Sequence, residues 1–294
     1  MSVCTLCPRK CGVDREIMRG YCQSGGKMHI ARAKLHYWEE PPISGTRGSG
    51  TIFFTGCSLR CAFCQNSEIS GESLHGKDFT VEEFIETIKK LEAMGAHNIN
   101  LVTPTHFASQ IAEALRIYKP RVPVVYNCGG YESVETLRML EGIVDIYLPD
   151  FKYLNTDHAK KYSMAEDYPE VAKAALAEMV RQTGEPAFDE CGMMKRGVIV
   201  RHLLLPGCLA DGKRVVKYLH ETYGNRIYMS LMSQYTPLES LDAVKYPELN
   251  RKVPEYAYEK LVDYAISLGV MQAFIQEGDT AKESFIPPFT LEGV

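Results

Sequence analysis

The sequence predicts an α/β fold in the form of a partial, open (β/α)6 TIM-like barrel. Apolar runs typical of buried strands lie at 51–55, 98–103, 122–127, 143–148, 198–205 and 226–231, with a weaker run at 271–275. Helical patterns separate these runs, and strands that alternate with helices form parallel sheets with right-handed crossovers. The strand–helix units are too few for the eight that close a full barrel.

Helical patterns fill the gaps between these strands. Thr80-Val-Glu-Glu83 has the capping-box pattern, and apolar residues follow it at helical spacing. Further helices are expected at about 107–118, 133–141, 168–182, 212–222 and 255–268. The segment 183–197 has little helix or strand signal and could form a lid if the substrate is a small molecule or another polymer. The tail Ile286–Phe289 should be extended, because its paired prolines forbid a helix.

Composition limits the class of protein. The chain has 294 residues, of which 45% are hydrophobic and 24% charged, which is ordinary for a globular protein. The net charge of −4 argues against a nucleic-acid binder with a generally basic surface. No apolar run approaches the ~20 residues of a membrane helix. Ten cysteines without a secretory signal favour metal ligation in a reducing compartment, so we expect a cytoplasmic protein.

The cysteines after the first strand predict the chemistry. Cys57, Cys61 and Cys64 have the spacing Cys-x3-Cys-x2-Cys and lie on the loop that leaves this strand, where α/β barrels place their active sites. Three thiolates can hold three irons of a [4Fe–4S] cluster and leave the fourth iron open for a substrate or cofactor. The alternative is a zinc knuckle completed by a distant fourth cysteine.

The loop resembles the cluster loop of radical S-adenosylmethionine (SAM) enzymes. The matching residues are Gly56-Cys57-x3-Cys61-x-Phe63-Cys64-Gln65-Asn66. The resemblance implies that the open iron binds the amino and carboxylate groups of SAM. It also implies reductive cleavage of SAM to methionine and a 5′-deoxyadenosyl radical, which removes a hydrogen atom from the substrate. A partial barrel is the fold that this resemblance implies.

A second cysteine set, Cys4, Cys7, Cys11 and Cys22, precedes the first barrel strand. Four thiolates make a closed metal site, and such sites are structural or carry electrons. Zinc, a rubredoxin-like iron and an iron–sulfur cluster all suit such a set, and the thiols could also be unliganded. We therefore expect a cysteine-rich, metal-binding extension over residues 1–48, followed by the barrel and a C-terminal extension over residues 49–294.

The whole chain also resembles pyruvate formate-lyase activating enzyme-like (PflX-type) proteins. The resemblance rests on 4–12, 101–106, 145–153, 201–207 and 285–289. It implies catalytic roles for Asp150, Lys152 and His202, which would also contact SAM, and it implies that Phe63 offers its backbone to the adenine. Asn66 of the cluster loop and the polar strand-end residues Thr103, Thr105, His106 and Asn127 extend the expected cofactor site.

Two segments depart from the pattern of activating enzymes. Thr103-Pro-Thr-His106 stands where those enzymes have Gly-Gly-Glu, and Tyr126-Asn-Cys-Gly129 replaces an acidic motif. A glycyl-radical protein is still one candidate substrate, with a flavodoxin or ferredoxin as electron donor and no nucleic acid or membrane as partner. The alternatives are radical chemistry on a small molecule or another polymer, and a noncatalytic iron–sulfur or zinc protein.

Overall fold

The computed structural model describes residues 3–71, 75–239, 241–276 and 289–294. Residues 286–288 of the tail that was predicted to be extended lie outside the described residues. The described strands form one mixed sheet in the order β10-β9-β8-β6-β5-β4-β2-β1-β3, with β7 paired to β8. The parallel strands that match the predicted runs are β2 (Ser49–Phe54), β4 (Ile99–Val102), β5 (Val124–Cys128), β6 (Ile146–Pro149), β8 (Met194–Leu203), β9 (Tyr228–Met232) and β10 (Ala273–Ile275).

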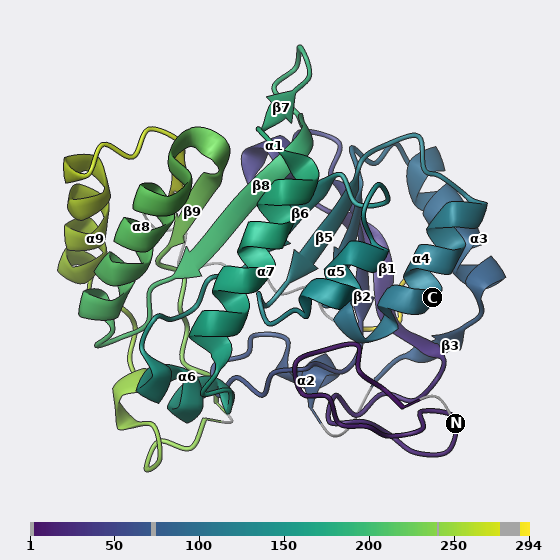
Figure 1. Cartoon of the computed structure of the whole chain (residues 1–294), viewed down its shortest axis with the longest axis horizontal. Coiled ribbons are helices and arrows are strands. Elements are labelled where there is room, and N and C mark those ends of the chain that lie inside the picture. The colour runs from purple at the N-terminus through teal and green to yellow at the C-terminus, as the bar shows by residue number, and fades with distance from the viewer. Residues whose placement is uncertain (1–2, 72–74, 240, 277–288) are drawn as a thin grey trace.

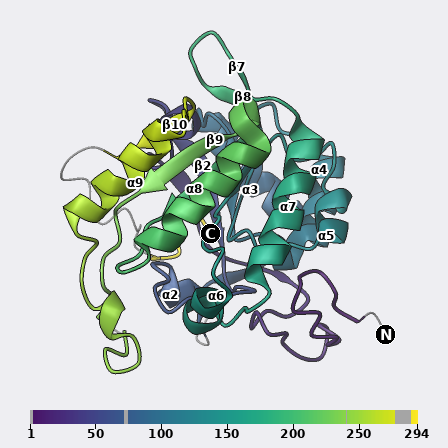
Figure 2. The ribbon, with the colours of Figure 1, turned by 60° about the vertical axis from the view of Figure 1, so that its left-hand side comes forward.

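The main helices cover one face of this sheet (Figure 1, Figure 2). They are α3 (Val81–Ala93), α4 (Ala108–Ile117), α5 (Val134–Met139), α7 (Tyr168–Thr183), α8 (Leu209–Tyr223) and α9 (Glu255–Ser267). The capping box at α3 is present: Glu83 N–H donates to Thr80 Oγ1, and the Glu83 carboxylate accepts from Thr80 N–H. Six strand–helix units followed by β10 confirm the predicted α/β class and partial barrel.

Besides the short β7, two of the described strands were not predicted. β1 (Met28–His36) pairs antiparallel with β2, and β3 (Lys77–Phe79) pairs antiparallel with β1. Because β1 belongs to the sheet, a domain boundary after residue 48 would separate β1 from β2, the strand with which it pairs. The C-terminal residues also join this edge, where Ala33 N–H donates to Glu292 O at 3.0 Å.

The shorter elements mark the two ends of the sheet. The short helices α2 (Ser67–Ser70) and α6 (Thr156–Ser163) lie with the N-terminal coil at the lower end of Figure 1, to which the parallel strands point. The short helix α1 (Pro41–Ser44) and β7 (Ala187–Phe188) lie at the upper end. The short 3-10 helices are η1 (Thr105–Phe107), η2 (Gly224–Arg226) and η3 (Pro247–Leu249).

The lid predicted for 183–197 is wrong. This segment ends α7 and forms the β7–β8 hairpin, in which Ala187 pairs with Arg196. Phe188 packs edge-on against Tyr228, the first residue of β9, with 5.3 Å between ring centroids. The hairpin therefore sits at the end of the sheet opposite the cysteine loop (Figure 1). No helix in the described parts of the chain is long and apolar enough to span a membrane.

Candidate active site

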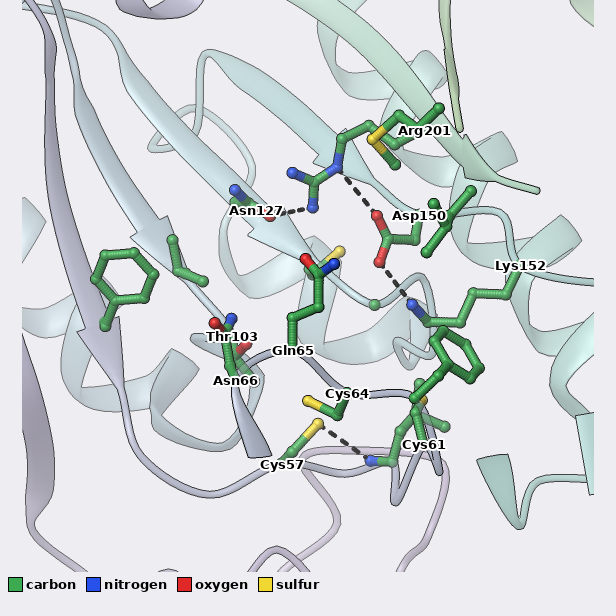
Figure 3. Close-up of a pocket in the computed structure, with 18 of the residues that line it drawn as sticks. Cys57, Cys61, Cys64, Gln65, Asn66, Thr103, Asn127, Asp150, Lys152 and Arg201 are labelled. Atoms are coloured by element: carbon green, nitrogen blue, oxygen red, sulfur yellow. Dashed lines mark hydrogen bonds and ion pairs between the residues drawn. The ribbon is translucent and has the colours of Figure 1, made fainter. Parts of the chain in front are cut away.

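The three cysteines after β2 line one cavity of about 240 Å³ at the carboxyl ends of the parallel strands (Figure 3). Cys57, Cys61 and Cys64 follow β2 because the chain turns at Gly56, whose φ of +83° favours glycine. Each thiol also has a hydrogen-bonding neighbour: Leu59 N–H at 3.3 Å from Cys57 Sγ, Ser163 Oγ at 3.0 Å from Cys61 Sγ, and Ser70 Oγ at 3.3 Å from Cys64 Sγ.

The three thiols are suited to bind a positively charged group. Burial raises the pKa of Cys57, and the neighbouring sulfurs of Cys61 and Cys64 raise it further. Burial likewise raises the pKa of Cys61, against the opposing charge of Lys152. Three thiolates on this loop would repel one another unless a cation lay between them. Iron–sulfur clusters satisfy this need, because each thiolate binds a different iron of one cluster.

A network of charged side chains forms the neighbouring wall of the cavity (Figure 3). Lys152 Nζ lies 2.6 Å from Asp150 Oδ2, and Arg201 Nε lies 3.0 Å from Asp150 Oδ1. Arg201 also donates to Asn127 Oδ1 at 2.6 Å and pairs with Glu39 Oε2 at 3.4 Å. Every charged group of this network thus has a counter-charge.

The network fixes the ionisation of its members. Burial opposes the charge on Asp150, but Lys152 and Arg201 together hold its pKa below the ordinary value. Burial also opposes the charge on Lys152, yet Asp150 holds its pKa above the ordinary value. Lys152 therefore carries a positive charge beside the cysteine loop, with its Nζ 5.6 Å from the centre of the Phe63 ring.

Most of the predicted cofactor residues line this cavity. Besides the cysteines they are Phe63, Asn66, Thr103, Asn127, Asp150 and Lys152. Thr103 has a positive φ of 57°, and its N–H donates to Asn127 O at 2.8 Å, which ties the end of β4 to β5. Thr105, His106 and His202 do not line the cavity.

The two histidines are buried elsewhere. His106 Nε2 donates to Thr55 O at 2.7 Å, and burial lowers the pKa of His106 to about 3. His202 Nδ1 donates to Phe151 O at 2.8 Å, and its Nε2 faces α8, where a Cβ on Gly212 would lie 3.0 Å away. Burial lowers the pKa of His202 as well. Both rings are therefore buried outside the cavity, where lowered pKa values disfavour their charged forms.

Thr105 points away from the cavity. Its hydroxyl donates to Glu132 Oε1 at 2.9 Å, and Tyr126 OH donates to Glu132 Oε2 at 3.1 Å. All three residues are buried. Burial raises the pKa of Glu132 to about 7, although these hydrogen bonds favour the carboxylate.

Two charged residues of the site, Glu39 and Arg201, were not among the predicted site residues. Arg201 and Leu203 alternate with His202 along β8, and the first two line the cavity. Because side chains alternate across a strand, choosing His202 for the cavity meant excluding Arg201. Glu39 follows β1, a strand that was not predicted, so nothing in the sequence indicated its place.

The N-terminal cysteines lie on a coil beside the cluster loop. A Cβ on Gly20 would lie 3.2 Å from Cys11 Sγ and 3.6 Å from Cys22 Sγ, so this glycine lets both sulfurs approach the backbone. Burial raises the pKa of Cys7 to about 12, and the nearby Cys22 and Cys4 sulfurs add to this. Within the described ranges, no group of three or more His, Cys, Asp or Glu is arranged to hold a metal ion.

Comparisons with known proteins agree with this site. Residues 51–196 match the family model of the radical SAM superfamily. An uncharacterized protein of Methanocaldococcus jannaschii, MJ0674, is 29% identical over 271 residues, which cover 89% of this chain and 74% of that protein.

Two solved structures share the fold. The FeFe-hydrogenase maturase HydG from Carboxydothermus hydrogenoformans is 13% identical with a TM-score of 0.50, covering 77% of this chain and 53% of that chain. SuiB from Streptococcus suis, bound to the precursor peptide SuiA, is 12% identical with a TM-score of 0.50, covering 76% and 47%. The chain thus spans about half the length of these proteins. The family match over residues 51–196 places this chain in the radical SAM superfamily, whose members are enzymes that use a [4Fe–4S] cluster and SAM.

Proposed function

We propose that this chain binds a [4Fe–4S] cluster through Cys57, Cys61 and Cys64 and cleaves SAM reductively. One observation carries the proposal: the three thiols and the Asp150–Lys152 ion pair open onto the same cavity. When bound, the cluster supplies the electron that cleaves SAM to methionine and a 5′-deoxyadenosyl radical, which abstracts a hydrogen atom from the substrate.

The residues of the chain would bind and orient SAM. Lys152 carries a positive charge in the cavity and would pair with the SAM carboxylate. Asp150 holds Lys152 in place, since its other oxygen accepts from Arg201. Asn66, Thr103 and Asn127 line the same cavity and would meet the hydroxyls and amino group of SAM. Phe63 would offer its backbone to the adenine.

We propose a PflX-type activity on a glycyl-radical protein as the first candidate reaction. The support is the resemblance of the motifs across the chain. A flavodoxin or ferredoxin would be the electron donor.

A second candidate, a small-molecule substrate, is favoured by the C-terminal segment. Phe289 packs edge-on against Phe53, a residue of the cavity wall, with 5.4 Å between ring centroids. A loop of a protein substrate that entered the cavity beside β1 would meet Phe289, whereas a small molecule would need less room there.

We further propose that the N-terminal set Cys4, Cys7, Cys11 and Cys22 binds a second metal, zinc or iron. The support is the density of thiols and the approach of Cys11 and Cys22 to Gly20. These sulfurs would have to draw together when the metal binds. The ten cysteines form no disulfides in this structure and would mostly serve as metal ligands, which suits a reducing compartment, and we propose a cytoplasmic location on that ground.

Anaerobic reconstitution followed by dithionite and SAM tests the main proposal, with 5′-deoxyadenosine as the product assayed. Cys61→Ala should abolish the product and the part of the iron–sulfur absorption that belongs to this cluster. Cys191→Ala is the matched control, because Cys191 is exposed and lines a different pocket beside the β7–β8 hairpin. Cleavage that survives Cys61→Ala would overturn the assignment of the loop.

The second metal needs its own measurement. Iron and zinc are counted per chain in the wild type and in Cys7→Ala. Loss of one zinc with iron unchanged would identify a zinc site, and loss of iron beyond the first cluster would identify an iron centre. Equal metal contents in the two proteins would contradict a second site.

A further inference from the structure

We propose that Ser163 tunes the reduction potential of the cluster by donating a hydrogen bond to Cys61, and that Arg9 is the positioning residue that holds Ser163 there. The inference rests on the proposed binding of a cluster by the loop. It assigns the N-terminal extension a role in the chemistry through Arg9, independently of any second metal.

Ser163 is the last residue of α6 and is fully buried. Its Oγ lies 3.0 Å from Cys61 Sγ and 3.0 Å from the hydroxyl of Tyr153, which is itself buried. The helix end is joined to the loop a second time, because Ala62 N–H donates to Tyr162 O at 2.7 Å. The end of α6 and the cluster loop therefore form one packed unit.

Ligation of iron would fix the direction of these hydrogen bonds. A sulfur bound to iron is a thiolate, which has no proton to donate. Ser163 must then donate to Cys61 Sγ, and its oxygen is free to accept from Tyr153 OH. The result is a buried chain of two hydrogen bonds that runs from Tyr153 through Ser163 to the cluster ligand.

Arg9 fastens this unit to the N-terminal extension. Its Nε donates to Ser58 O at 2.9 Å in the cluster loop, and its two terminal nitrogens donate to Met164 O at 2.7 Å and Ser163 O at 3.4 Å. A cation at the last carbonyls of a helix is also favoured by the helix dipole. Because Arg9 lies between Cys7 and Cys11, the extension and the cluster loop share this residue.

The physical consequence is a change of potential. Reduction adds negative charge to the cluster and its ligands, and a hydrogen bond to a ligand sulfur stabilises that charge. The Ser163 hydroxyl therefore raises the reduction potential and makes the electron that cleaves SAM easier to deliver to the cluster. Without the hydroxyl, the potential should be more negative.

Redox titration of the reconstituted protein, followed by electron paramagnetic resonance, tests this. Ser163→Ala should shift the midpoint potential to a more negative value. It should also remove an exchangeable proton coupled to the reduced cluster, visible as a difference between H₂O and D₂O. Ser49→Ala is the control, a buried serine at the start of β2, at the end of the strand away from the cysteine loop, and should leave both unchanged. An unchanged potential in cluster-loaded Ser163→Ala would overturn the proposal.

Arg9→Gln separates a positioning role from a general structural one. It should shift the potential in the same direction but less than Ser163→Ala, and it should add nothing in the Ser163→Ala background. A full additional shift in the double variant would overturn the role of Arg9. If Ser163→Ala does not hold iron, Tyr153→Phe carries the test, with a smaller shift of the same sign. A wild type that binds no cluster would instead refute the proposed function.

Discussion

Arg201 donates from Nε to Asp150 Oδ1 at 3.0 Å, joining the ends of β8 and β6 beside the cysteine loop. The same guanidinium reaches Asn127 on β5 and Glu39 after β1. One cation thus holds together four segments that are far apart in the sequence. This contact keeps one Asp150 oxygen occupied while the other accepts from Lys152.

Arg201→Gln should therefore destabilise the fold. It would leave Glu39 and Asp150 buried with less counter-charge, and breaking a buried pair in this way costs about 3–5 kcal/mol. Chemical denaturation measures the change in the free energy of unfolding. Arg138→Gln is the control, because its side chain is 63% exposed and its partner Glu178 keeps Arg181; a surface pair contributes about 0–1 kcal/mol. Equal effects of the two substitutions would contradict the role of Arg201.

Lys152→Gln should weaken SAM binding. A charged hydrogen bond to a carboxylate contributes about 1.5–3 kcal/mol, so the dissociation constant should rise roughly tenfold or more. Asp150 would keep Arg201 as its partner, so the protein should still fold. Equilibrium dialysis against SAM on the reconstituted protein measures the affinity. Lys195→Gln removes a comparable ion pair, with Asp189 at 3.1 Å near the β7–β8 hairpin, and should leave the affinity unchanged.

Much of this fold could be predicted from the sequence, because its parallel strands are continuous apolar runs and its main helices are amphipathic. β1 was missed because Arg32 and Lys34 interrupt its apolar pattern, and both side chains pair with Glu292 at the far end of the chain. α6 was missed because most of its residues are polar; only Ala159, Tyr162 and Ser163 are buried.

The site was predictable only where a local motif fixed it. The cysteine loop and the Asp150–Lys152 pair are each contained in a short segment. The histidines were misplaced for a different reason: β8 is buried on both faces, so the pattern cannot show whether Arg201 or His202 faces the cavity. That choice depends on the helix packed outside, since α8 presents Gly212 to His202 and leaves room for the ring there.

Glu132→Gln should change how stability depends on pH. The pKa of Glu132 is raised to about 7 by burial, so the folded state favours the protonated form. The stability of the folded chain with Glu132 protonated is fully present below the ordinary pKa of about 4.5, and it is lost as the pH rises through 7. Glutamine cannot ionise, so the variant should gain stability relative to wild type between pH 4.5 and 7, by up to roughly 3 kcal/mol.

Denaturation at several pH values measures this difference. The exposed Glu135→Gln, three residues further along the chain, is the control and should show a flat difference over the same interval. A flat difference for Glu132→Gln would mean that Glu132 ionises as readily in the folded chain as in the unfolded one.

Gly56→Ala tests whether the N-terminal extension supports the cluster loop. Gly56 directly precedes Cys57, and a Cβ there would lie 2.4 Å from both Cys22 O and Ser24 Oγ. The methyl group should push the extension away from the loop, so that reconstitution yields less iron per chain and proteolysis cuts the extension sooner. The positive φ of 83° adds a backbone cost of about 1 kcal/mol or more for any side chain.

Gly142→Ala separates these two effects. Gly142 has a similar φ of +77°, but a Cβ there meets nothing within 4 Å, so it carries the backbone cost without the collision. Both variants should lose stability, whereas only Gly56→Ala should lose iron. If both retain iron equally, contact with Cys22 is not needed to hold the loop. If Gly56→Ala alone fails to load the cluster, the extension supports the loop through this backbone contact as well as through Arg9.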